Sequence, residues 1–266
     1  MMFKDAILNE YYELYKKHIQ TNTENPEYTE NTHNILTQHG DITINWKKNA
    51  EQVGQLINCH RIQLFKSIIT ELNKHTIPYF LSDGSALGCY RNGKIIPHDV
   101  DIDITISEEH IHDAINVLKQ NLNPTHLHIQ TLDRYSKIDW NENSDKFIDL
   151  CNNYENIAKK ICVKYTGLLN EPKNHENIPD LFAINIDIYT YRQNEKHMNI
   201  NYKHKDINLT AINFPLIDIF PLKTALFENI EDISVVANPI KYLERAYGYI
   251  GPDCYWDKNT QRFCKL

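Results

Sequence analysis

The apolar positions of this chain repeat with a helical spacing in some segments and alternate with polar positions in others. Spacings of three and four residues occur from Phe3 to Ile19, from Asn49 to His75 and beyond Ser107, so these segments are predicted to be helices. The helix from Asn49 to His75 is expected to bury one stripe of apolar side chains. That stripe consists of Val53, Leu56, Ile57, Leu64, Phe65, Ile68, Ile69 and Leu72.

Alternation of apolar and polar residues predicts several short strands. The segments concerned are His126 to Thr131, Lys160 to Tyr165 and Leu181 to Tyr191, and the continuous apolar run Ile77 to Leu81 is a further predicted strand. The strictest alternation is Asp99-Val100-Asp101-Ile102-Asp103-Ile104. Because successive side chains of a strand point to opposite faces, its three aspartates are expected to share one face and its apolar residues the other.

Asp99, Asp101 and Asp103 form the first candidate site. Carboxylates two residues apart on a strand are separated by roughly 7 Å and repel each other unless a cation joins them or one is protonated. A hard divalent ion resolves this repulsion, and Mg²⁺ favours one or two carboxylates together with phosphate oxygens. The pattern alone also fits the solvent face of an edge strand, where charge opposes aggregation.

A glycine turn before this strand suggests a phosphate site. Gly84-Ser85 follows the apolar segment Ile77 to Leu81, and glycine lets backbone N–H groups approach a phosphate closely. A short helix from Ala86 to Asn92 would point its positive end the same way. Arg91 adds a guanidinium suited to bidentate phosphate contact. Gly84, Ser85 and Arg91 are therefore predicted to bind phosphate.

A third carboxylate is expected on a later strand. In Leu181 to Tyr191, three isoleucines alternate with polar residues, and Asp187 stands on the polar face. A lone aspartate at such a position is often only solvated. Asp187 is nevertheless the preferred third acid of the site, and Asp180 and Asp218 are weaker candidates.

The stretch from Asp83 to Ile104 resembles the LicD/fukutin family, a branch of the nucleotidyltransferase superfamily. The family pattern reads roughly D-G-t-L-L-G-x-x-R-x-x-x-x-I-P-W-D-x-D-x-D, and here it becomes Asp83-Gly84-Ser85-Ala86-Leu87-Gly88, Arg91, and Ile96-Pro97-His98-Asp99-Val100-Asp101-Ile102-Asp103. Two positions depart from the pattern, since His98 replaces a Trp and Ala86 replaces a Leu. The superfamily also expects a third acid on a later strand, which favours Asp187.

A second block of resemblance lies between Phe214 and Gly248. Its elements are Phe220-Pro221-Leu222-Lys223, Phe227-Glu228-Asn229, Asn238-Pro239, Tyr242-Leu243 and Tyr247-Gly248. Asn229 stands where the family has a Gly. Asn238-Pro239 is a typical helix start and Gly248 a typical helix end, so packing alone also explains much of this block.

The resemblance implies an α/β (α+β) fold with a small mixed, largely antiparallel sheet flanked by helices. Residues 1–48 are predicted to be an N-terminal helical extension and linker. Residues 49–266 are predicted to form the catalytic domain, in which 133–179 is an insert.

By resemblance, the protein is expected to be a metal-dependent phosphotransferase. It would move a phospho-alditol or phosphocholine group from a CDP-activated donor such as CDP-ribitol or CDP-choline to a sugar hydroxyl of a glycan, releasing CMP. Asp101, Asp103 and Asp187 would hold Mg²⁺ or Mn²⁺, and Gly84, Ser85 and Arg91 would position the donor phosphates. Asp99 would be either a further ligand or the base that takes the acceptor proton.

Two other functions remain open at this point. The same fold supports a nucleotidyltransferase that moves NMP from an NTP to a small molecule or sugar. A non-catalytic module that binds nucleotide or carbohydrate is the third hypothesis, which the complete set of carboxylates disfavours.

Charge and cysteine content indicate which partners and which cellular location are expected. A net charge of −7 argues against broad binding to nucleic acid. No early segment joins a basic start to an apolar run, so neither signal peptide nor membrane anchor is expected, and a cytoplasmic location is predicted. The six cysteines form no C-x-x-C pair and are expected to be reduced. A zinc site at Cys151, Cys162 and His175 is a minor alternative, because some fukutin-type enzymes carry a zinc-binding insert.

Overall fold

The main sheet of the protein is mixed and largely antiparallel. The computed structural model describes residues 7–17, 40–122, 127–133, 159–165, 168, 180–199, 213–251, 253–257 and 262–266. Within these residues, seven strands form one sheet with the central order β1-β2-β5-β4-β3, and β6 and β7 extend it beside β5. The strands are β1 (Tyr79–Leu81), β2 (Asp101–Ser107), β3 (Leu127–Asp133), β4 (Lys159–Tyr165), β5 (Ile184–Gln193), β6 (His197–Asn199) and β7 (Asn213–Pro215). Only the pair β2–β5 is parallel among these ladders.

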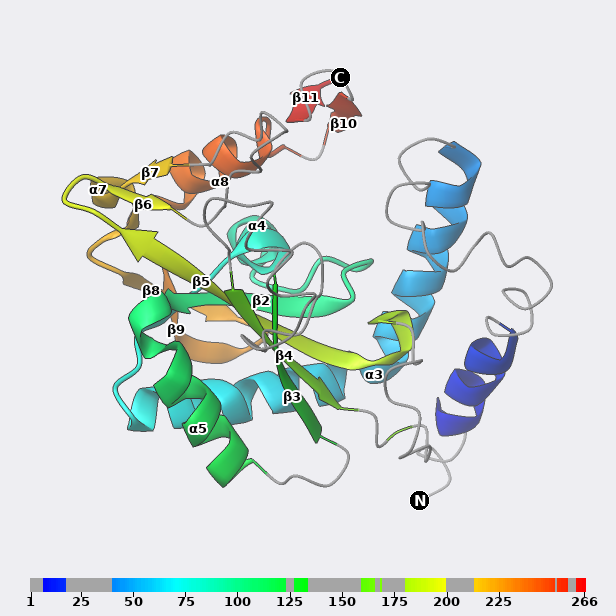
Figure 1. The fold of residues 1–266 in the computed structure, drawn as a ribbon. Helices are drawn as coiled ribbons and strands as arrows, with labels where there is room; N and C mark the ends of the chain where they lie inside the picture. Colours follow the sequence, from blue (N-terminus) through cyan, green and yellow to red (C-terminus); the bar gives the residue numbers. More distant parts are fainter. Residues whose placement is uncertain are drawn as a thin grey trace, which may run out of the picture.

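Helices and two small hairpins surround this sheet. The helical elements are α3 (Gly40–Lys74), α4 (Asp83–Asn92), η2 (Glu108–His110), α5 (Ile111–Asn121), η5 (Asp180–Phe182), α7 (Leu216–Ile219) and α8 (Pro239–Tyr247). The hairpins pair β8 (Lys223–Phe227) with β9 (Ile230–Val235) and β10 (Cys254–Asp257) with β11 (Arg262–Lys265). Figure 1 shows α3 and α5 together on one side of the sheet, with α4 and α8 toward the C-terminal hairpin. The predicted α/β class is therefore confirmed.

Isoleucines of the alternating strands form the main core. Ile102, Ile104 and Ile106 of β2 are completely buried, and so are Ile186 and Ile188 of β5. They pack together with apolar residues of α3 and α5. Each such side chain contributes about 1.5–3 kcal/mol when it is fully buried. This apolar face holds the two strands in place and leaves their opposite, polar face for the aspartates.

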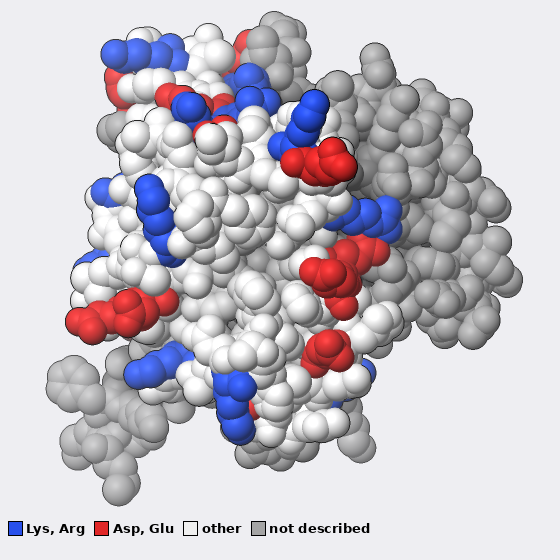
Figure 2. All heavy atoms as spheres, turned by 90° about the vertical axis from the view of Figure 1, so that its left-hand side faces the viewer, with Lys and Arg blue, Asp and Glu red and all other residues white. Residues whose placement is uncertain are grey.

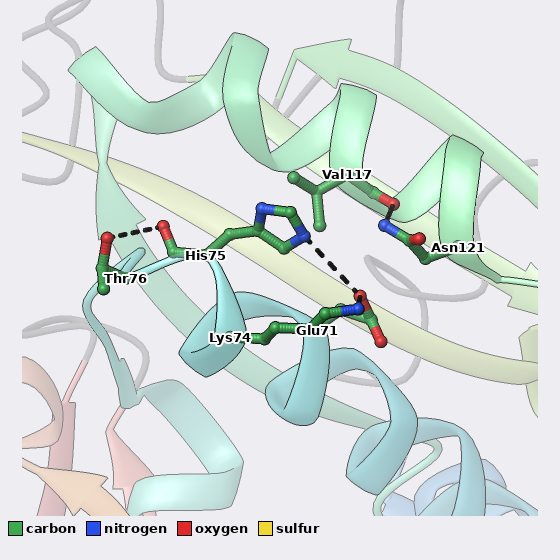
Figure 3. A network of polar contacts seen from close by, with 6 residues as sticks. All are labelled: Glu71, Lys74, His75, Thr76, Val117 and Asn121. Carbon is green, nitrogen blue, oxygen red and sulfur yellow. Dashed lines mark hydrogen bonds and ion pairs between the residues drawn. The ribbon is translucent and has the colours of Figure 1, made fainter.

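The predicted stripe of α3 is confirmed as a buried surface. Six of its members are buried, and Leu56 and Leu64 are partly buried against the same clusters; the six are Val53, Ile57, Phe65, Ile68, Ile69 and Leu72. At its C-terminal end α3 lies beside α5, where the His75 ring points toward Glu71 at 3.9 Å between Nε2 and Oε2 (Figure 3).

Two further apolar clusters pack the N-terminal helix and the C-terminal helix against the rest of the protein. Residues 7–17 form a helix, and the Tyr11 hydroxyl on it donates to the carbonyl of Phe182. The other cluster joins α4 and α8 through Leu87, Tyr242 and Leu243. The C-terminal helix is therefore packed against the helix that begins beside the aspartate strand.

Several boundaries differ from those predicted. Helix α3 begins at Gly40 rather than Asn49, so it starts inside the range 1–48 that was expected to be extension and linker. Within the range 133–179, β4 is an inner strand of the sheet, and apart from it only 133 and 168 are described. The domain boundaries stay a prediction.

Charges of both signs are mixed on the surface. On the face drawn in Figure 2, Lys and Arg side chains lie interspersed with Asp and Glu side chains. Among the described helices, none combines the length and the apolar character needed to cross a bilayer.

Candidate active site

Three predicted carboxylates converge at the start of β2 and in the middle of β5. The parallel pairing sets Asp103 directly opposite Asp187, and Asp101 lies two residues earlier on β2. One ligand oxygen from each of the three lies within 4.8 Å of the others. Asp103 and Asp187 are only 5% and 6% exposed. Residues far apart in the sequence therefore meet in one acidic cluster.

The donor set of this cluster fits a hard divalent ion. Ligands on opposite sides of an Mg²⁺ ion bound at about 2.1 Å are separated by roughly 4 Å, close to the spread of the three oxygens. Carboxylate oxygens are also the ligands that Mg²⁺ and Mn²⁺ prefer. The residues that fit such an ion are Asp101, Asp103 and Asp187.

Burial and mutual repulsion oppose ionisation in this cluster. Burial raises the pKa of Asp101 well above its usual range, and the charges of Asp99 and Asp187 raise it further. Burial likewise raises the pKa of Asp103 well above its usual range, and the charge of Asp101 raises it further. Without a bound cation, the site therefore favours holding protons.

Asp99 lies beside the cluster, just before the strand. The alternating sequence pattern predicts one continuous strand that includes Asp99, but β2 begins at Asp101. The Asp99 N–H donates to the carbonyl of Ile96, which turns the chain there, and its carboxyl is in hydrogen-bond contact with that of Asp101. Burial raises the pKa of Asp99. The turn before β2, and not the strand itself, therefore brings the Asp99 carboxyl beside that of Asp101.

The expected glycine turn is instead the first turn of α4. This helix begins at Asp83, whose φ is +45°, and not at Ala86. A Cβ on Gly84 would lie 2.3 Å from Oδ2 of Asp99. The absent side chain of Gly84 therefore leaves room for a carboxyl of the site.

Ser85 and Arg91 make contacts within the protein. The Ser85 hydroxyl is buried and accepts a 2.8 Å hydrogen bond from the backbone N–H of Asp103. Arg91 donates from Nε and Nη2 to the carbonyl of Ile250, and from Nη2 to that of Gly251, at 2.9–3.1 Å. Ser85 thus ties α4 to β2, and Arg91 ties α4 to the chain beyond α8. Phosphate binding by Gly84, Ser85 and Arg91 stays a prediction.

Lys160 is a site residue that the sequence analysis missed. Its Nζ lies 2.5 Å from Oδ2 of Asp187, and both side chains are under 10% exposed. Burial alone lowers the pKa of Lys160, but the charge and hydrogen bond of Asp187 outweigh burial, and the net pKa is raised. The alternation of Ile161 and Val163 is typical of a strand with Lys160 on its polar face. No local pattern, however, identifies Asp187 as the partner of Lys160.

Arg61 is a second buried cation that the sequence analysis missed. It is 1% exposed, and its Nη1 donates to Oδ1 of Asn58 and, at 3.4 Å, to the carbonyl of Asp99. Burial lowers the pKa of Arg61, and the charge of Asp101 opposes this shift. A signal was present, because Arg61 stands four residues after Ile57 and four before Phe65, within the apolar stripe of α3.

Tyr247 brings the end of α8 to the acidic cluster. Burial raises its pKa well above the usual range, and the charges of Asp83 and Asp103 raise it further. Its ring packs near that of Phe263 in β11, with centroids 6.3 Å apart. The second block of resemblance therefore contributes a residue beside the carboxylates.

Other sequence candidates lie elsewhere or outside the described residues. Asp218 belongs to α7 and lies 3.7 Å from Nζ of Lys241. For the minor zinc alternative, Cys162 lies in β4, whereas Cys151 and His175 fall outside the described residues. Asn229 has a φ of +60° in the turn between β8 and β9, a conformation that Asn tolerates where the family has Gly.

Comparison with known proteins identifies the family. Residues 76–231, more than half of the 266, match the family described as LicD/FKTN/FKRP, nucleotidyltransferase domain. A search of curated proteins found no match. The matched segment includes the whole acidic cluster of Asp101, Asp103 and Asp187. Members of this family are transferases of nucleotidyltransferase type that act in glycan modification. The chain therefore belongs to the LicD/FKTN/FKRP family and carries its nucleotidyltransferase domain.

Proposed function

We propose that the protein is a metal-dependent transferase that uses a CDP-activated donor. It would move a phospho-alditol or phosphocholine group to a sugar hydroxyl of a glycan and release CMP. The observation that supports this proposal most strongly is the convergence of three carboxylate oxygens within 4.8 Å on the polar face of β2 and β5. Such a cluster is costly without a cation, which favours a catalytic purpose.

In this scheme each residue has a distinct task. Asp101, Asp103 and Asp187 would hold Mg²⁺ or Mn²⁺, which when bound would neutralise the diphosphate and charge developing on the leaving phosphate. The acceptor oxygen would form a bond to the phosphorus distal to cytidine, and the bond from that phosphorus to the CMP oxygen would break. Gly84, Ser85 and Arg91 would position the donor phosphates.

Asp99 is the proposed proton acceptor for the attacking hydroxyl. Its carboxyl lies beside Asp101 but is not among the three whose oxygens converge in the described structure. A raised pKa suits a base that must take a proton near neutral pH. This geometry favours the role of base over that of a further ligand.

Thermal unfolding with candidate ligands would test the donor class. The protein would be heated with CDP-ribitol, CDP-choline, CMP, CTP or ATP, each with and without Mg²⁺ or Mn²⁺. Because a ligand that binds the folded state raises its stability, a metal-dependent shift with CDP-linked donors is expected. A shift confined to nucleoside triphosphates would instead favour transfer of NMP, and no shift at all would contradict the proposal.

The substitution Asp103→Asn should separate catalysis from stability. We expect turnover to fall by at least about 100-fold, because a metal ligand is lost. In EDTA the same variant should melt at a higher temperature than the wild type, because one member of a repelling buried cluster becomes neutral. Asp232→Asn, at an exposed position with a φ of +57°, is the matched control and should change neither property. Normal turnover by Asp103→Asn would refute the scheme.

A further inference from the structure

The ion pair between Lys160 and Asp187 occupies one side of the acidic cluster. Besides the 2.5 Å contact to Oδ2 of Asp187, the Lys160 ammonium lies 5.5 Å from the ring centroid of Tyr189. The Tyr189 hydroxyl is 3.3 Å from the same Oδ2. The two contacts of Lys160 follow from the strand register. In the antiparallel ladder of β4 and β5, Lys160 stands opposite Tyr189, and Cys162 stands opposite Asp187. The ammonium is therefore fixed in place by two strands.

This arrangement gives the cluster a cation of its own. Removing one partner of a buried ion pair strongly destabilises a protein, because the other charge is left uncompensated. Lys160 thus balances one carboxylate of a site that otherwise contains only negative groups from β2 and β5. A divalent ion bound by Asp101, Asp103 and Asp187 would lie close to this ammonium, and like charges so near each other repel strongly at low dielectric.

We propose that Lys160 is a positioning residue that acts as the internal counter-ion of the cluster and weakens its affinity for a divalent ion. The inference rests on the proposed metal site. The free site would then bind the ion poorly by itself. The donor's diphosphate would add negative charge beside both cations, so that ion and donor bind with positive cooperativity. Such coupling is reciprocal, since each ligand strengthens binding of the other by the same factor.

Binding of Mn²⁺ alone to the full chain would test this inference directly. Free Mn²⁺ would be followed by electron paramagnetic resonance at pH 8 for the wild type, Lys160→Met and Lys160→Arg. Met keeps the length of the side chain without its charge, whereas Arg keeps the charge. We expect Lys160→Met to bind Mn²⁺ roughly ten-fold more tightly than the wild type, and Lys160→Arg to stay within about two-fold of it. Lys119→Met, at an exposed position of α5, is the control and should resemble the wild type.

Thermal unfolding supplies a second readout. In EDTA, Lys160→Met should melt below the wild type, and saturating Mn²⁺ should raise its melting temperature by more than it raises that of the wild type. Equal or weaker Mn²⁺ binding by Lys160→Met would overturn the inference, and would leave the proposed function intact if the wild type binds Mn²⁺. If neither protein binds Mn²⁺, with or without CDP-ribitol, the proposed metal site and this inference both fail.

Discussion

At the scale of single residues, the contact between Gly84 and Asp99 leaves no room for a side chain. A Cβ at position 84 would lie 2.3 Å from Oδ2 of Asp99 and 3.2 Å from its Cγ. Real Cβ atoms do not approach other atoms so closely, so any substitution must move the carboxyl. Because that carboxyl also contacts Asp101, its displacement would reach the acidic cluster on β2.

Gly84→Ala should therefore lower activity by displacing Asp99. We expect a loss of activity of at least about ten-fold and a destabilisation of roughly 1–3 kcal/mol, as for other overpacked sites. Urea unfolding and a turnover assay would measure the two effects. In the Asp99→Ala background the same glycine substitution should cost little stability, since the obstructing carboxyl is gone. An equal cost in both backgrounds would contradict this explanation.

Single residues also show what the sequence can predict. Asp101 and Asp103 were predictable because they depend on a local alternation within one strand. The partner of Lys160 was not, because it depends on the register between β4 and β5, which no local pattern specifies. Arg61 lay within the apolar stripe of α3, so its burial could have been predicted, although its neighbour Asp99 could not.

At the scale of elements, Arg91 joins α4 to the chain that follows α8. Three hydrogen bonds run from its guanidinium to the carbonyls of Ile250 and Gly251, while α8 packs against α4 by apolar contacts. The sequence predicted a cation suited to phosphate, and a guanidinium serves backbone carbonyls equally well. Residue type alone does not distinguish these two partners. The start of α4 was also mispredicted, because it depends on contacts between segments that are distant in the sequence. The Ser82 N–H donates to the carbonyl of Asp103 in β2, and the Asp103 N–H donates to the Ser85 hydroxyl, so the helix begins at Asp83.

The substitution Arg91→Met would separate the two roles. If Arg91 mainly anchors the C-terminal segment, hydrogen exchange in β10 and β11 should rise by about ten-fold or more, because three hydrogen bonds to partly buried carbonyls are lost. Exchange in β2 and β5 should stay unchanged. Arg245→Met, at an exposed position of α8, is the matched control. Unchanged exchange together with weaker CMP binding would instead favour the phosphate role.

At the scale of the whole molecule, the acidic cluster links stability to pH. The pKa values of Asp99, Asp101 and Asp103 are all raised in the folded, metal-free protein from the ordinary value of 3.8. The folded state therefore binds more protons than the unfolded state once the pH exceeds that value. The stabilising effect of these protons is present at low pH and is lost as pH rises through the raised pKa values.

We expect the unfolding free energy in EDTA to fall as the pH rises above 3.8 and through the raised pKa values of Asp99, Asp101 and Asp103, because the folded carboxyls lose their protons there. Denaturant titrations at several pH values would measure it. Asp101→Asn should flatten the dependence, since it removes one coupled group and lessens repulsion on the others. Saturating Mn²⁺ should flatten the pH dependence of the unfolding free energy in the wild type but not change it further in Asp101→Asn. A stability that rises with pH in EDTA would contradict the assignment.

The parallel pairing of β2 with β5 also determines when the site can appear during folding. Asp103 and Asp187 are direct neighbours on these strands but distant in the sequence, so their meeting requires a long loop to close. Ladders of this kind form more slowly than helices and hairpins. Capture of a divalent ion should therefore be absent from early intermediates and arise together with burial of the isoleucine face. Fluorescence of a terbium ion, added during refolding, would time the completion of the native sheet without any probe attached to the chain.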